Sequence, residues 1–199
     1  MFNVEATTTP SQPLVAGDLR THLRLNDQGE DTQLTEFLAA AVERFEDDTR
    51  RPVLSTTYRQ YLTKWPADLS IVLGRGGVTS VTAVKKYAAD GTTTSDVTGY
   101  LADLKTAPVR VVLPDAPDEL ETSAGVPLQT VGYVEFVAGW ANAAAVPKAV
   151  LVAIKMLAAH WYEQREAYRD SAFEMRTTPD GWARIVARYR LGLSGDWDQ

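Results

Sequence analysis

The stretch DTQLTEFLAAAVERFEDD, residues 31–48, carries the clearest structural signal in the chain. Its apolar residues recur at the three- and four-residue spacing that places them on one side of an α-helix. They are Leu34, Phe37, Leu38, Ala41, Val42 and Phe45. A helix over these residues is about 27 Å long at 1.5 Å per residue. Asp31 or Thr32 is expected to cap its start and Pro52 to end it, so the sequence predicts a long amphipathic helix with one face in a core.

A second long helix is predicted after Pro147, which suits a first helical turn. Two adjacent rows of apolar residues follow it: Val150, Ile154, Leu157 and Trp161, and beside them Leu151, Ala158 and Tyr162. Because these rows cover a wide arc, we expect this helix to be the most buried element of the protein. Shorter helices are expected over residues 18–23 and 182–189.

Between these helices the composition changes to Thr, Val and Tyr in alternation, which is typical of strands. About five strands are predicted, over residues 57–62, 69–73, 78–88, 109–113 and 130–137. Because the strands form one block and do not alternate with helices, the fold class is α+β with an antiparallel sheet. We expect N-terminal helices of a body over 14–53, a β-rich insertion over 54–139 and C-terminal helices over 145–199, with the first 13 residues as an extended arm.

The overall composition disfavours an enzyme without excluding one. The chain has 20 Lys and Arg against 26 Asp and Glu, a formal net charge of −6, no cysteine and two histidines. General bases and metal ligands are therefore scarce, and the acidic balance disfavours wrapping of duplex DNA. No apolar run reaches the ~18 residues of a membrane span, so we expect a soluble protein made in the cytoplasm.

Motifs that could carry chemistry are weak. His160 and Glu163 lie three residues apart on a predicted helix, but no second pair of this kind is present to complete a di-metal site. The run Gly74-Arg75-Gly76-Gly77 follows a strand yet lacks the Lys of a phosphate-binding loop, so a β-turn is favoured. Ser194 lies in a Gly-rich run without a nearby histidine. We therefore expect no catalytic residue, no cofactor and no metal.

Charge is distributed unevenly along the chain. The segment from residue 114 to 127 is predicted to be an exposed acidic loop; it holds Asp115, Asp118, Glu119 and Glu121 and no basic residue. The C-terminal part instead combines basic and aromatic residues: Trp182, Arg184, Arg188, Tyr189 and Arg190. Such a cluster binds nucleic acid or a protein partner, and the acidic balance of the chain favours the protein partner.

Residues 146–150 (VPKAV) and 158–166 (AAHWYEQRE) resemble the "VP…A…LLVAHWYENRE" helix of the head-to-tail adaptor, or connector, proteins of long-tailed phages, prophages and gene transfer agents. Further segments resemble that family in order: residues 18–25, 31–51, 78–81, 87–91 and 135–140. The resemblance covers the chain from about residue 14 to 191. One departure is that Arg50-Arg51-Pro52 lacks the usual Gly after the long helix.

The resemblance implies a virion protein that forms a dodecameric ring of helical bodies beneath the portal protein and connects the capsid to the tail. The β part projects at the ring, a downstream tail-completion or stopper protein binds below, and DNA passes through without sequence-specific binding. By position, the C-terminal docking helix would bind the portal through six residues: Trp182, Arg184, Arg188, Tyr189, Arg190 and Leu191. The acidic loop with Asp115, Asp118, Glu119 and Glu121 would face the DNA channel, where like charge keeps the duplex from sticking.

The C-terminal helix over residues 182–189 is predicted to be weakly amphipathic, with too few internal contacts to belong to the core, so that it orders on binding. The main alternative to the connector function is a small nucleic-acid-binding regulatory protein that uses the C-terminal Arg cluster. A hydrolase is the third hypothesis. A salt titration distinguishes the connector from the regulator, because binding to phosphates weakens steeply with salt.

Overall fold

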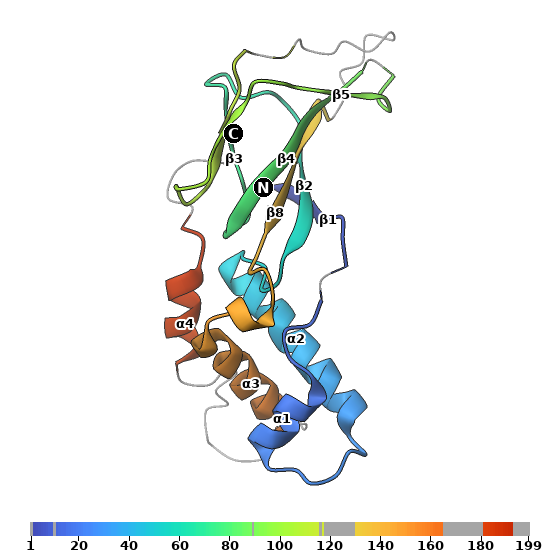
Figure 1. Cartoon of the computed structure of the whole chain (residues 1–199), viewed down its shortest axis with the longest axis vertical. Helices are drawn as coiled ribbons and strands as arrows, with labels where there is room; N and C mark the ends of the chain where they lie inside the picture. The colour runs from blue at the N-terminus through green and yellow to red at the C-terminus, as the bar shows by residue number, and fades with distance from the viewer. Residues whose placement is uncertain are drawn as a thin grey trace, which may run out of the picture. The chain divides into compact units, whose positions relative to one another are not determined.

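The computed structural model describes residues 2–9, 11–88, 90–115, 117, 130–164 and 181–192. The chain divides into two compact units. One comprises residues 11–54 and 140–190 and holds the helices, and the other comprises residues 1–10, 55–139 and 191–199 and holds the strands (Figure 1). The predicted α+β class with an antiparallel β part is confirmed. None of the helices in the described part of the chain combines the length and the apolar character that a membrane crossing requires.

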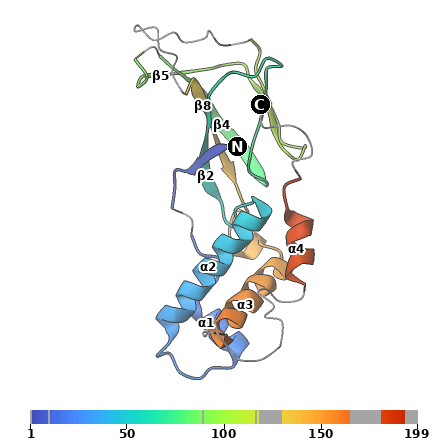
Figure 2. The same ribbon diagram turned by 180° about the vertical axis from the view of Figure 1, so that it is seen from behind.

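The helical unit contains α1 (Ala16–Leu23), α2 (Asp31–Thr49), α3 (Lys148–Glu163) and α4 (Trp182–Tyr189). Helices α2 and α3 pack against each other, and α1 and α4 each contact both of them (Figure 2). Their shared core includes Leu19, Leu34, Leu38, Phe45, Ile154 and Leu157. The long helix predicted over residues 31–48 is therefore present, because its regularly spaced apolar residues meet the apolar arc of α3.

The ends of α2 differ from the expectation in a physically informative way. The predicted side-chain cap by Asp31 or Thr32 is wrong: Glu30 is the N-cap, and its side chain makes no capping hydrogen bond. Asp31 instead forms an ion pair with Arg20, with 2.8 Å between Oδ1 and Nε. At the other end Arg50 adopts a left-handed backbone conformation with φ of 54°, which glycine adopts at lower cost.

The β unit contains two antiparallel sheets. The first has the order β1-β2-β8-β4-β5 and the second the order β3-β7-β6. The strands are β1 (Asn3–Ala6), β2 (Thr56–Leu62), β3 (Ser70–Val72), β4 (Val78–Tyr87), β5 (Thr94–Asp96), β6 (Leu101–Asp103), β7 (Arg110–Val112) and β8 (Gly132–Ala138). In the larger sheet the central strand β8 pairs with β2 on one side and with β4 on the other, so this sheet is built around long-range pairings.

Side chains from both sheets share one core. Tyr58 of β2 stacks on Phe136 of β8, with 5.8 Å between the ring centroids, and both are buried with Val111 of the smaller sheet. Gln60 is buried as well, and both ends of its amide are satisfied. Its Nε2 donates to the Val72 carbonyl at 2.8 Å, and its Oε1 accepts from the Gly74 N–H at 2.8 Å. A buried amide with both ends paired fixes the two sheets together.

Three strands were not predicted. Residues 3–6 belong to the expected extended arm, yet they form β1 at the edge of the larger sheet, with Asn3 opposite Tyr61. Strands β5 and β6 have three residues each, too few for alternation to be detected. The run Gly74-Arg75-Gly76-Gly77 connects β3 to β4, and Gly77 has a φ of 69°, which agrees with the predicted turn between strands.

Candidate functional site

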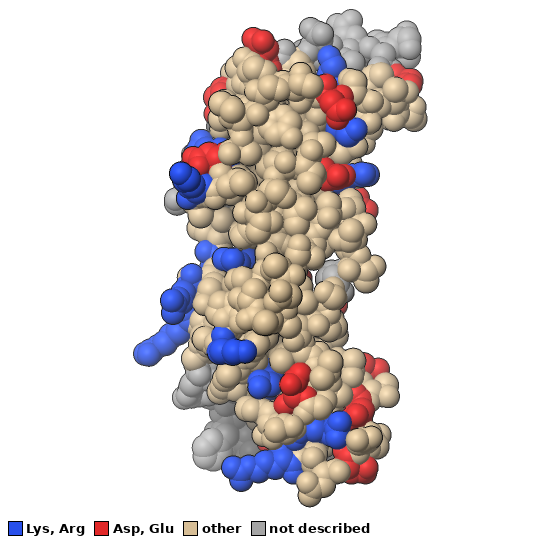
Figure 3. Space-filling view, viewed as in Figure 1, with Lys and Arg blue, Asp and Glu red and all other residues tan. Residues whose placement is uncertain are grey.

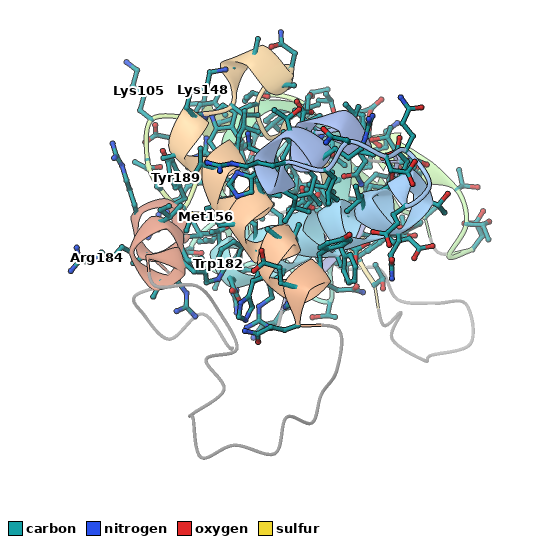
Figure 4. The ribbon with its side chains drawn as sticks, turned by 90° about the horizontal axis from the view of Figure 1, so that it is seen from below. Lys105, Lys148, Met156, Trp182, Arg184 and Tyr189 are labelled. Atoms are coloured by element: carbon teal, nitrogen blue, oxygen red, sulfur yellow. The ribbon has the colours of Figure 1, made fainter. Side chains whose placement is uncertain are left out.

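The six residues predicted to dock a partner separate into two groups in the structure. Trp182 and Leu191 are buried, with 6% and 7% of their surface exposed, and Tyr189 is partly buried. The three remaining residues, Arg184, Arg188 and Arg190, are exposed. Figure 4 shows Trp182 and Tyr189 on the side of α4 that faces the other helices and Arg184 pointing away from it.

Trp182 fastens the start of α4 to the C-terminal half of α2. Its ring meets the Phe45 ring edge-on, with 6.1 Å between centroids. Its indole N–H donates to Oδ2 of Asp48 at 2.9 Å. The same Asp48 oxygen accepts from Arg44 at 3.1 Å, so the carboxylate joins α4 to α2 and also holds a neighbour one turn away. A buried indole with a paired N–H is a core residue of the helical unit.

Tyr189 anchors the other end of α4. Its ring lies 6.3 Å from Phe45 and 5.8 Å from Trp140, centroid to centroid. The Arg51 guanidinium lies 4.2 Å from the centroid of the Trp140 ring, a cation–π contact. Burial lowers the pKa of Arg51, an effect that Tyr189 partly offsets. The end of α4 therefore packs on an aromatic and guanidinium cluster.

The expectation of a weakly amphipathic helix with few internal contacts is wrong. Ile185 and Val186 pack on the core together with Trp182 and Tyr189, and these four residues share one side of α4. An eight-residue helix is too short to be stable by itself, so its order comes from this packing. Sequence reasoning missed the anchors because Phe45, Asp48 and Trp140 are far away in the chain; the spacing of the four apolar residues was the available signal.

The charged residues on the outer side of α4 are all basic. Arg184 and Arg188 lie one turn apart, Arg190 follows, and the helix contains no acidic residue. Figure 3 shows Lys and Arg side chains gathered at the margin of the molecule where Figure 1 places α4. Guanidinium groups bind carboxylate and phosphate oxygens through paired hydrogen bonds. This face, which we call the arginine row (Arg184, Arg188 and Arg190), can therefore hold an acidic surface of a partner.

The predicted acidic loop is described only at its start. Asp115 is exposed, whereas Asp118, Glu119 and Glu121 lie outside the described residues. The prediction that these four residues face a channel therefore stays a prediction.

The two histidines lie close together in the helical unit. His22 of α1 and His160 of α3 line an open hollow of about 340 Å³ together with Arg24, Met156 and Glu163. Within the ranges that the structure describes, no group of three or more His, Asp or Glu is arranged to hold a metal ion. The sequence analysis did not single out two exposed apolar residues of α3, Val152 and Met156. Their exposed fractions are 45% and 40%, and they lie on the side of the helix opposite the core.

Comparison with known proteins points to one class of particle component. Residues 108–190 match a family model described as the phage gp6-like head-tail connector protein. No curated protein matches the chain significantly. Three solved structures resemble it over nearly its whole length, and all three are parts of gene transfer agent (GTA) particles.

The first of these structures is a chain from the neck of an empty particle computed with C6 symmetry; it is 25% identical, has a TM-score of 0.76, and the match covers 97% of each chain. The second, from the virion of a native particle, is 25% identical with a TM-score of 0.76 and covers 99% of this chain and 100% of that one. The third, from the neck of a native particle computed with C12 symmetry, is 26% identical with a TM-score of 0.72 and covers 98% of each chain.

Proposed function

We propose that this chain, a structural head-tail connector, forms a ring at the neck of a tailed phage or phage-like particle, between the capsid and the tail. The observation that supports it most is the match of the whole fold to GTA neck components, together with the connector family model over residues 108–190. The match includes both the helical unit and the β unit, so it concerns the complete architecture rather than one common motif.

The proposed ring has twelve subunits. Neck structures of the similar chains are computed with C12 and with C6 symmetry, and a ring of twelve is compatible with both because it also contains a six-fold axis. In this arrangement the portal protein lies above the ring and a tail-completion or stopper protein below it. The DNA passes through the ring without sequence-specific contacts.

The arginine row is the proposed contact with the portal protein. Arg184, Arg188 and Arg190 are exposed on an element that is already folded, so docking would order side chains but no backbone. Trp182 and Tyr189 have a different proposed role from the one expected from sequence: they position the row by holding α4 on α2. Leu191, which is buried, continues the chain directly after the row.

The acidic loop is proposed to line the channel. Asp115 is exposed, and Asp118, Glu119 and Glu121 would add three further negative charges in the same segment. Like charge repels the phosphate backbone and keeps passing DNA from sticking. Replacing the four residues by Asn and Gln should slow DNA ejection and reduce infectivity; unchanged ejection by the variant particle would contradict this role.

The experiment that tests the docking proposal is a mass measurement of the purified chain with and without the portal protein of the same particle. The wild-type chain should form a complex of defined mass, and Arg184→Ala with Arg188→Ala should weaken it at least tenfold. Lys64→Ala with Lys105→Ala is the matched control, because it removes two exposed positive charges from the β unit. A wild-type chain that stays monomeric and ignores the portal protein would exclude the connector ring.

The regulatory alternative makes a different prediction. A nucleic-acid-binding protein that uses the Arg cluster would bind duplex DNA with an affinity that falls steeply with salt. The structural comparisons give this alternative no support, since the three similar chains described above all belong to GTA particles.

A further inference from the structure

The outward side of α2 carries an acidic stripe that consists of Glu36, Glu43 and Asp47 around the small residue Ala40. All four are exposed and follow one another at spacings of three or four residues, so they share one face of the helix. Among the residues that the structure describes, none of the three carboxylates has an ion-pair partner; α2 forms ion pairs between Asp48 and Arg44 and between Asp31 and Arg20. Within the described part of the chain, the stripe is a charged surface without a counterpart.

The outward side of α3 has the opposite character. Val152 and Met156 are 45% and 40% exposed, although both are large apolar side chains. Ala149 and Lys148 are exposed one turn earlier on the same face, and Met156 borders the open hollow beside His22. Figure 4 shows Lys148 and Met156 along the length of α3. We call this surface the α3 stripe: Lys148, Ala149, Val152 and Met156.

The two stripes face away from each other on opposite sides of the helical unit. Helix α2 buries Leu38 and Phe45, and α3 buries Ile154 and Leu157, in the same core. Each stripe lies on the side of its helix opposite to those buried residues, as the helical spacing requires. One subunit therefore cannot bring its two stripes together, but a row of subunits can.

The charges of the two helices are complementary. Helix α2 contains six acidic residues and one Arg, whereas α3 contains Lys148 and Lys155 and a single acidic residue at its last position, Glu163. Small residues, Ala40 and Ala149, lie within the two stripes and allow helices to approach closely. Exposed Val152 and Met156 would gain burial from such an approach, which supplies the apolar part of the interface.

We propose that the acidic stripe of α2 in one subunit packs against the α3 stripe of a second copy, and that this contact, repeated head to tail, closes the ring. This inference rests on the proposed connector function. Because the two faces are different, the interface is heterologous, the type that generates rings when its rotation closes. The arginine row lies on a third element, α4, and stays free for the portal protein.

Cross-linking tests the interface directly, because the chain has no cysteine of its own. Glu36→Cys, Glu43→Cys and Asp47→Cys are each combined with Met156→Cys, assembled on the portal protein and treated with a bis-maleimide. At least one pair should give a ladder of covalent oligomers up to the full ring. The matched single-cysteine variants should give no ladder, and neither should Glu43→Cys combined with Leu101→Cys, since Leu101 is an exposed residue of the β unit.

A mixing experiment tests the head-to-tail character. Val152→Glu with Met156→Glu destroys the α3 stripe, and Ala40→Trp blocks close approach to the acidic stripe while leaving its charge negative, so the two altered faces also repel each other. Each variant alone should stay monomeric while circular dichroism shows a native helix content. Mixed together, they retain one intact stripe each, so they should form a one-to-one dimer that cannot grow. Two variants that both still form rings, or a mixture without the dimer, would overturn the proposed interface.

The failure of this inference is distinguishable from failure of the proposed function. Rings of normal mass in which no cysteine pair cross-links would exclude the α2–α3 contact and leave the connector ring standing. A wild-type chain that forms no ring with its portal protein would contradict the connector proposal itself.

Discussion

The attachment of α4 to the helical unit depends on Trp182, and its replacement should release that helix without unfolding the rest. The indole is 6% exposed, meets Phe45 edge-on and donates its N–H to Asp48 at 2.9 Å. Because α4 has only eight residues, it has little helical stability of its own. Once its anchor is lost, we expect α4 to melt locally while α2 and α3 keep their shared core.

The free-energy cost of replacing Trp182 follows from the contacts that its side chain makes. Replacing a buried Trp by Ala costs about 3–5 kcal/mol through lost burial and the remaining cavity. Trp182→Phe keeps most of the ring packing and removes the N–H bond to a carboxylate, a class of bond that contributes about 1.5–3 kcal/mol. Asp48 keeps Arg44 as a partner, and its side chain is 25% exposed, so the lower value applies. About 1.5 kcal/mol corresponds to roughly a tenfold larger fraction of undocked helix.

Hydrogen exchange measures this effect residue by residue. The amides of Ile185 and Arg190, which donate to the carbonyls of Gly181 and Val186, should exchange about tenfold faster in Trp182→Phe and lose most of their protection in Trp182→Ala. Amides of α2 and α3 should keep theirs. Arg184→Ala, a change on the exposed side, is the control and should alter nothing. Unchanged protection of α4 in Trp182→Ala would refute the anchoring role.

Three further predictions concern single positions. Arg50→Gly relieves a left-handed φ of 54° and should stabilise the chain by about 0.5–1 kcal/mol in urea unfolding, the strain relieved minus the greater flexibility of unfolded glycine. Gly132→Ala should destabilise it by about 1–3 kcal/mol in the same assay, because a Cβ there would lie 2.3 Å from the Lys85 carbonyl oxygen. The Asp90 carboxyl accepts a hydrogen bond from the Thr93 hydroxyl and from two backbone N–H groups, which lower its pKa from 3.8 to about 2. Its stabilising effect is therefore complete above pH 4 and lost as the pH falls through about 2; a nuclear magnetic resonance titration should find that midpoint, and Thr93→Val should raise it.

The helices were predictable because their apolar spacing is strong and local. The helix expected over residues 31–48 is observed as Asp31–Thr49. Strand β1 was not predictable in the same way, since Asn-Val-Glu-Ala has neither β-branched enrichment nor a buried face. Its extended form comes from pairing with β2, a partner more than 50 residues later in the chain. Short edge strands take their structure from tertiary contacts, which local patterns do not contain.

The composition of the candidate site was predictable, but not its division into two faces. The sequence shows a segment with three Arg, a Trp and a Tyr, and both kinds of residue are frequent at binding hot spots. It does not show that Asp48 accepts the indole N–H or that the Trp140 ring meets the Tyr189 ring edge-on. These partners come from elements far apart in the chain. Aromatic residues expected to touch a partner therefore became the anchors that hold the arginine row in place.

If the anchors and the arginine row work as one unit, their mutations should not be additive in portal binding. The row acts through a helix that Trp182 keeps folded, so a helix that has melted presents its Arg side chains without fixed geometry and must regain order on binding. Trp182→Ala alone should then weaken portal binding about as much as Arg184→Ala with Arg188→Ala, and the triple variant should lose little more. A double-mutant cycle measures this coupling. Fully additive losses would mean that Trp182 contacts the partner directly, as the sequence alone had suggested, and that the packing on Phe45 has no part in docking.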